Sequence, residues 1–103
     1  MKRTTAQTQM PTYEVSGKEL TIYWDEQAQT DSEGETVYSY AYCVINIYAD
    51  RSQIIERVMG CMYPTYGSEM AAIINGGADA AAHEAARANA KALADGWLVN
   101  QEQ

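Results

Sequence analysis

The stretch from Thr36 to Tyr48 constrains the fold most, because its side chains alternate in kind along the chain. The odd positions are small or aliphatic: Val37, Ser39, Ala41, Cys43, Ile45 and Ile47. The even positions are Tyr38, Tyr40, Tyr42, Val44, Asn46 and Tyr48. A period of two puts the two sets on opposite faces of a β-strand. We therefore expect one long strand, with a bend or bulge near residues 42–44, whose small face packs under a helix.

A second strand is predicted over residues 19–25, where Leu20, Ile22 and Trp24 alternate with Thr21 and Tyr23. The polar residues 26–35 then predict a hairpin loop of about eight to ten residues. A short strand over residues 13–15 precedes a Ser-Gly-Lys turn signal. Together these segments predict a two- or three-stranded antiparallel sheet.

Helical spacing takes over after residue 49. Asp50 is a good N-cap with Gln53 three residues on, and apolar residues then recur on one helical face up to residue 62. A second, shorter helix is expected to be capped by Ser68 and to stop at residues 75–77. A third, alanine-rich helix is expected from Asp79 to Asp95, with residues 97–99 as an apolar clasp that folds back. The predicted fold is α+β, with two or three helices packed on one face of the sheet.

The polar residues 1–12 are predicted to form a flexible leader, residues 13–99 a single α+β domain, and residues 100–103 a frayed tail. Large apolar side chains are few for a chain of 103 residues, so the core is expected to be small. Self-association is one way to bury more surface. The alanine-rich helix fits either close packing within the chain or packing against a second copy or a partner.

Charge and composition exclude several classes of protein. Fourteen acidic residues against seven basic ones give a net charge of −7, which argues against a nucleic-acid-binding surface. No apolar run approaches the ~18 residues of a membrane span, and no apolar segment follows the N-terminus as in a secretory signal. A cytoplasmic location is therefore expected. The two cysteines, Cys43 and Cys61, lack the spacing of a metal site and are expected to be buried thiols, with one long-range disulfide as the alternative.

No residue pattern indicates an enzyme or a cofactor. His83-Glu84 is followed by Ala-Ala-Arg87, so a zinc-protease motif is absent and the single histidine has no second ligand at a matching spacing. Asp31, Glu33 and the residues around them do not match the register of a calcium loop. We expect solvated turn residues there, no metal site and no catalytic residues.

The tyrosine face is the strongest candidate site. We define it as Tyr23, Tyr38, Tyr40 and Tyr42, which a paired sheet would place on one side. Two interpretations stay open. The rings could be cross-strand pairs on a half-covered sheet, or they could form an interaction surface, since tyrosine offers a large contact area and a hydroxyl group at low entropic cost. A protein partner is preferred over a sugar because no polar cluster converges beside the rings.

Several short segments in order are similar to a known group of proteins. They are Trp24-Asp25-Glu26, the aromatic strand after it, Ile54-Ile55-Glu56-Arg57, residues 66–71 and the alanine-rich C-terminal helix. This layout resembles small structural or assembly proteins encoded in the tail regions of phages and prophages of gut bacteria. The chain departs from that pattern at residues 76–78, where Gly-Gly-Ala replaces a basic or polar helix start. The resemblance implies a tail-associated, virion-located role without catalytic residues.

The expected function is a non-enzymatic structural or assembly protein that self-associates or binds a protein partner. The alternative is a small binding module that uses the tyrosine face for a peptide or glycan.

Overall fold

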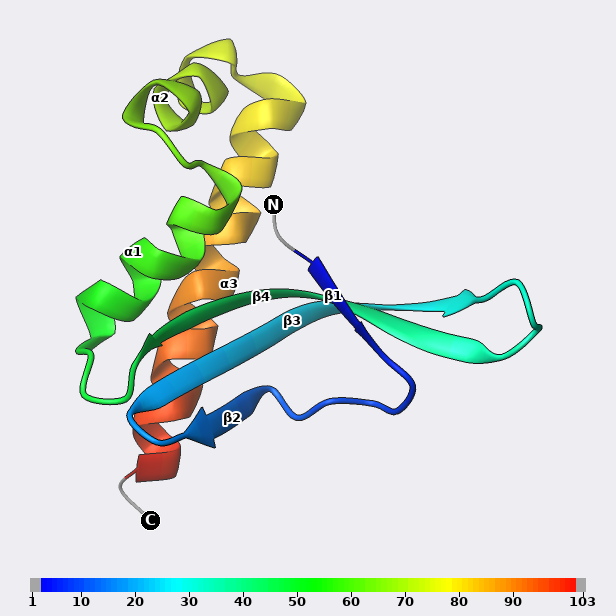
Figure 1. Ribbon diagram of the computed structural model, residues 1–103. Coiled ribbons are helices and arrows are strands. Elements are labelled where there is room, and N and C mark those ends of the chain that lie inside the picture. Colours follow the sequence, from blue (N-terminus) through cyan, green and yellow to red (C-terminus); the bar gives the residue numbers. More distant parts are fainter. Residues whose placement is uncertain (1–2, 102–103) are drawn as a thin grey trace. The chain divides into compact units, whose positions relative to one another are not determined.

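The computed structural model describes residues 3–101 and contains a four-stranded antiparallel sheet and three helices (Figure 1). The predicted α+β class is confirmed, with four strands instead of two or three. The chain divides into a β unit that ends at Tyr48 and a helical unit that begins at Ala49. The packing of the helices on one sheet face, and a single domain over residues 13–99, stay predictions.

The β unit has the strand order β1-β4-β3-β2. Its strands are β1 (Arg3–Ala6), β2 (Tyr13–Ser16), β3 (Glu19–Thr30) and β4 (Thr36–Asn46). The long strands β3 and β4 form the central hairpin, in which Tyr23 lies opposite Tyr42 and Ile22 opposite Cys43. Because β1 and β2 occupy opposite edges, the connection between them, residues 7–12, has to pass from one edge of the sheet to the other. We call this connection the crossover segment.

Strand β1 occupies part of the segment that the composition predicts to be a flexible leader. It pairs with β4, with Arg3 opposite Ala41. The Arg3 side chain donates to the Ser39 hydroxyl at 2.8 Å and to the Asp25 carboxylate at 2.9 Å, and it also reaches the carbonyl oxygens of both residues. Backbone pairing and one charged side chain therefore fix a segment that has little apolar surface to bury. Residues 1 and 2 lie outside the described residues.

The irregularity in the hairpin lies in β3 and not in β4, so the predicted bulge near residues 42–44 is wrong. The register shifts between Trp24 and Gln27, so that Asp25 and Glu26 together oppose Tyr40. Asp25 has a φ of 55°, a left-handed conformation that aspartate tolerates better than most side chains.

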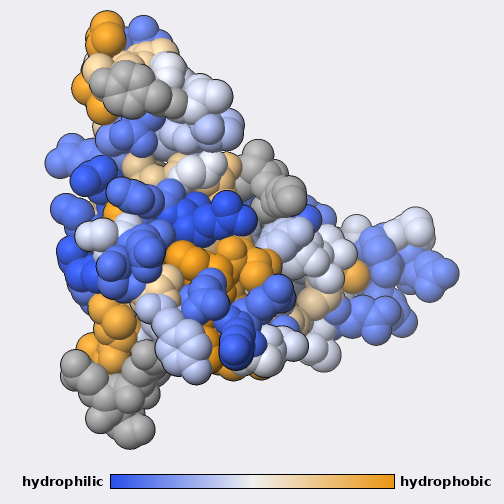
Figure 2. Space-filling view, turned by 60° about the vertical axis from the view of Figure 1, so that its left-hand side comes forward, coloured by the Kyte–Doolittle hydropathy of each residue, from blue (hydrophilic) through white to orange (hydrophobic). Residues whose placement is uncertain are grey.

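Beyond the bulge, β3 continues to Thr30, and the loop covers only residues 31–35 instead of the predicted eight to ten. Asp31 shortens the loop, because its carboxylate accepts from the backbone N–H groups of Glu33 and Glu35. The space-filling view shows mainly hydrophilic surface at this end of the hairpin (Figure 2). The sequence does not predict this outer part of β3, because its residues are polar and show no alternation with apolar side chains.

Helix α1 (Arg51–Met62) begins as the sequence predicts. Asp50 accepts from the Gln53 backbone N–H at 2.8 Å, and the Gln53 side chain accepts from the Asp50 N–H at 2.9 Å, which completes a capping box. The buried face of the helix consists of Ile54, Ile55, Val58 and Met59.

Helix α2 (Tyr66–Asn75) begins earlier than predicted. Thr65, and not Ser68, is the N-cap. Ser68 is the third helical residue of the capping box: its N–H donates to the Thr65 hydroxyl and its own hydroxyl oxygen accepts from the Thr65 N–H. Ile73 and Ile74 on this helix are exposed, with 45% and 75% of their surface accessible. Figure 2 shows hydrophobic surface at this end of the helical unit.

Helix α3 (Gly77–Gln101) is longer than predicted and passes through Gly96 without ending. Residues 97–99 are therefore helical and form no separate clasp. The reason is a continuous apolar stripe at helical spacing: Ala86, Ala90, Leu93, Ala94 and Trp97 are all buried. This burial outweighs the cost of one interior glycine, about 1 kcal/mol. Helix α3 packs against α1, and small alanines on its stripe allow a close approach of a neighbouring element.

Candidate functional site

The register of β3 and β4 places the tyrosine face on one side of the sheet. Tyr23 lies opposite Tyr42, and Tyr38, Tyr40 and Tyr42 alternate along β4 on that same side. The rings of Tyr23 and Tyr40 meet edge to face, with centroids 5.8 Å apart and planes at 70°. Cross-strand aromatic packing is therefore present, as the first interpretation of these residues requires.

Tyr40 differs from the other three rings, because only 3% of its surface is exposed. Its hydroxyl donates to the Glu26 carboxylate at 2.5 Å and accepts from the backbone N–H of Met10 at 2.9 Å. Met10 belongs to the crossover segment, which also reaches Tyr23 through a backbone hydrogen bond of 2.8 Å from the Tyr23 N–H to the Thr12 carbonyl. The crossover segment is thus fixed to the tyrosine face at Tyr40.

The part of the tyrosine face that stays accessible consists of Tyr23, Tyr38 and Tyr42, which are partly exposed. Carboxylates border it. The Tyr23 hydroxyl lies 3.5 Å from Glu14, and Glu26 lies at the bulge, where the Gln9 side chain also donates to it. Burial and, next, the charge of Glu14 raise the pKa of Tyr23. The surface therefore combines apolar rings with acidic hydrogen-bond acceptors.

Alkaline pH is expected to destabilise the fold through Tyr40. Burial raises the pKa of Tyr40, and its hydrogen bond to Glu26 raises it further. The phenol ionises near pH 10 in the unfolded chain and only at higher pH in the folded one. Above about pH 10 the unfolded chain binds fewer protons, so the free energy of unfolding falls as pH rises, whereas this contribution is complete below that pH. Urea denaturation between about pH 8 and pH 11 measures the slope. A Tyr40→Phe variant should show a shallower decline, and an equal decline would contradict this origin.

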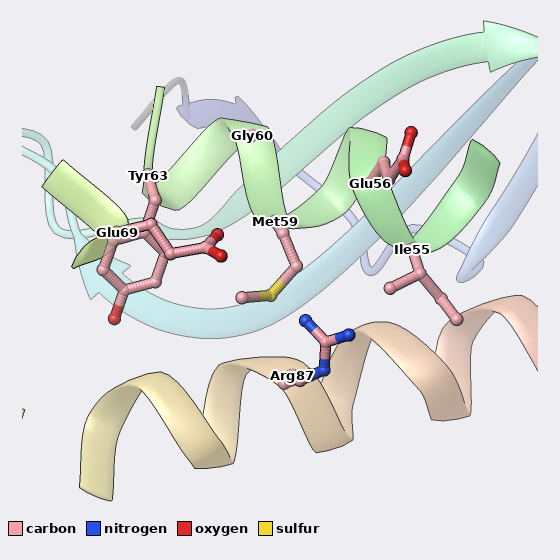
Figure 3. Close-up of a pocket in the computed structure, with 7 residues that line it drawn as sticks. All are labelled: Ile55, Glu56, Met59, Gly60, Tyr63, Glu69 and Arg87. Atoms are coloured by element: carbon pink, nitrogen blue, oxygen red, sulfur yellow. The ribbon is translucent and has the colours of Figure 1, made fainter. Parts of the chain in front are cut away.

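The helical unit contains a cavity of about 280 Å³ that is partly open to solvent (Figure 3). It is lined by Ile55, Glu56, Met59, Gly60, Tyr63, Glu69 and Arg87. The guanidinium of Arg87 extends from α3 towards α1, beneath Met59, and the carboxylate of Glu69 comes from α2. The sequence offers no signal for this cavity, because its residues come from three helices and one connection.

His83 on α3 is buried. Its Nε2 atom is 3.8 Å from a carboxylate oxygen of Glu69, and its ring centroid is 5.1 Å from that of Tyr63. The sequence indicates no role for His83, and the structure makes it a neighbour of two residues that line the cavity. Among residues 3–101, no group of three or more histidine, cysteine, aspartate or glutamate side chains is placed to hold a metal ion.

Comparisons with known proteins found no matching family model, no similar curated protein and no similar solved structure. The resemblance to phage tail-region proteins therefore stays a prediction. Within the described part of the chain, no helix is both long and apolar enough to cross a membrane.

Proposed function

We propose that this protein is a non-enzymatic structural or assembly protein that binds protein through its tyrosine face, first of all a second copy of itself. One observation carries the proposal: Tyr23, Tyr38 and Tyr42 stand partly exposed on one side of a paired sheet. Rings held by strands lose little entropy on binding, and a tyrosine combines a large contact area with a polar hydroxyl group. Aromatic residues of this kind are enriched at protein interfaces.

The charges around the face indicate what a partner surface has to provide. Glu14 and Glu26 border the rings, and the chain as a whole carries a charge of −7. A partner that presents N–H donors or basic side chains would complement this surface, whereas a nucleic acid would be repelled. We place the protein in the cytoplasm, or in the virion if its resemblance to phage tail-region proteins reflects its origin. No cofactor is part of this proposal.

The alternative function is a small binding module that holds a peptide or glycan on the same face. The observation in its favour is the carboxylate of Glu14 beside the Tyr23 hydroxyl, since both groups can bond to a ligand hydroxyl or amide. A binding module of this kind acts as a monomer, and a self-assembling protein does not. The oligomeric state in solution therefore separates the two functions.

Sedimentation velocity at tens of micromolar protein should show a dimer or larger species. We expect the double variant Tyr38→Ser/Tyr42→Ser to weaken association at least tenfold, because two contact rings are lost. Tyr48→Ser is the matched control, since Tyr48 is 76% exposed and lies beyond the end of β4. Thermal denaturation of each variant verifies that it folds. A wild-type monomer across this range, or equal loss in the control, would overturn self-association through this face.

A further inference from the structure

The cavity of the helical unit holds an arginine without a partner. Among the residues whose side chains the structure describes, Arg87 is exposed and makes no hydrogen bond or ion pair, in contrast to Arg51, which binds Asp95 at 2.7 Å. The guanidinium of Arg87 extends into the space between α1 and α3 (Figure 3). A guanidinium presents planar, paired N–H donors that match a carboxylate. A solvated arginine that lines the cavity and has no protein partner therefore offers a place for an anionic group.

Carboxylates occupy other parts of the same cavity. Glu69 contributes from α2, with one oxygen 3.8 Å from His83, and Glu56 contributes from α1. Neither forms an ion pair with Arg87 within 4.0 Å, although all three side chains line one space. The cavity thus keeps positive and negative groups apart. A molecule with one anionic and one cationic end can pair with both kinds of group. A simple anion would be repelled by the glutamates, and a simple cation by Arg87.

Size and lining narrow the class of molecule further. A volume of about 280 Å³ is at the lower end for small-molecule sites, so it suits an amino acid better than a nucleotide. Ile55 and Met59 supply an apolar wall for a hydrocarbon side chain, and the Tyr63 ring can face a cationic group. With two glutamates against one arginine, the cavity favours a ligand with an additional positive charge.

We propose that this cavity binds a small zwitterion of the amino-acid type, with its carboxylate on Arg87 and its ammonium group on Glu69. Basic amino acids bind best, because Glu56 is available to the second ammonium or guanidinium group. This site lies wholly within the helical unit and does not depend on the proposed function of the tyrosine face. Either proposal can fail without the other.

Calorimetric titration with free amino acids tests the proposal on the wild-type chain. L-lysine is expected to bind more tightly than L-leucine, and L-glutamate less tightly than both. Leucinamide lacks the carboxylate and N-acetylleucine lacks the ammonium group, so each should bind at least tenfold more weakly than leucine. Equal binding of leucine and either analogue would overturn the zwitterion assignment. Absence of binding for every compound up to millimolar concentrations would overturn the site.

Substitutions then test which residue binds each charged end of the ligand. Arg87→Gln should weaken leucine binding at least tenfold and leave leucinamide unchanged, whereas Glu69→Gln should leave N-acetylleucine unchanged while weakening leucine. Lys91→Gln is the matched control, since it removes one positive charge from an exposed position one turn further along α3. A similar loss in Lys91→Gln would show that only the overall field matters, which contradicts the proposed contact.

A blocking variant leaves every charge in place. Gly60 lines the cavity, and a Cβ atom added there meets no atom within 4 Å. Gly60→Leu puts a bulky side chain beside the cavity and also favours the helix. Binding of leucine and lysine should be lost while the far-UV circular dichroism is unchanged. Undiminished binding in a folded Gly60→Leu protein would place the ligand elsewhere and overturn the proposal.

Discussion

Replacing Tyr40 with alanine is expected to lower the melting temperature by more than about 10 °C. The ring is 3% exposed and packs edge to face on Tyr23, so its removal leaves a hole in the sheet face. The same change deletes the hydroxyl that joins Glu26 to Met10. Three kinds of contact are lost at once. This substitution should therefore lower the melting temperature more than any other single substitution on the tyrosine face.

Tyr40→Phe separates the ring from the hydroxyl. The phenylalanine keeps the packing, but the Met10 N–H and the Glu26 carboxylate each lose one hydrogen bond. We expect a smaller drop in melting temperature together with faster hydrogen exchange at the Met10 amide, because the crossover segment is then held less firmly. Tyr48→Ala is the control, since the Tyr48 side chain is 76% exposed. This variant should have the melting temperature of the wild type. A Tyr40→Ala protein that melts with the wild type would show that the ring is not buried in solution.

Tyr40 also shows where prediction from sequence reaches its limit. The alternation in residues 36–48 correctly predicts a strand whose tyrosines share one face. Tyr40 and Tyr42 are equivalent in that pattern, yet Tyr40 is 3% exposed and bonded to the crossover segment, whereas Tyr42 stays partly exposed. Its burial depends on β1 pairing with β4, a contact between residues far apart in the chain. Local periodicity carries no information about such a contact.

The predictions that held depend on interactions within a few residues. The capping box at Asp50 joins residues three apart, and the apolar face of α1 follows from helical spacing alone. The third helix shows the opposite case. Gly96 is a reasonable stop signal by itself, but buried Leu93 and Trp97 on either side of it continue one stripe, and tertiary burial overrides the local preference.

The cavity was out of reach of the sequence for a related reason. Arg87 and Glu69 are ordinary surface residues of two helices when read along the chain. They line one space only because α2 and α3 pack together. The histidine that the sequence leaves without a role is placed by the same packing against Glu69 and Tyr63. A site assembled from separate helices needs the helix arrangement before any of its residues can be recognised.

Replacing Ile54 with alanine is expected to lower the free energy of unfolding by about 2–5 kcal/mol. Ile54 is fully buried on the inner face of α1, and a helix that is already packed refills the lost volume only in part. Ile74→Ala makes the same chemical change in α2 at a side chain that is 75% exposed. We expect that control to stay within about 0.5 kcal/mol of the wild type.

The pair of isoleucine variants separates burial from helix propensity. Alanine is the better helix former, so propensity alone would make both variants more stable. Only burial predicts a large loss of stability at Ile54 and almost none at Ile74. Urea denaturation followed by far-UV circular dichroism gives both free energies of unfolding, provided that the slopes agree. Equal effects at the two positions would mean that α1 does not bury its apolar face in solution, and the cavity between α1, α2 and α3 would then lose its wall.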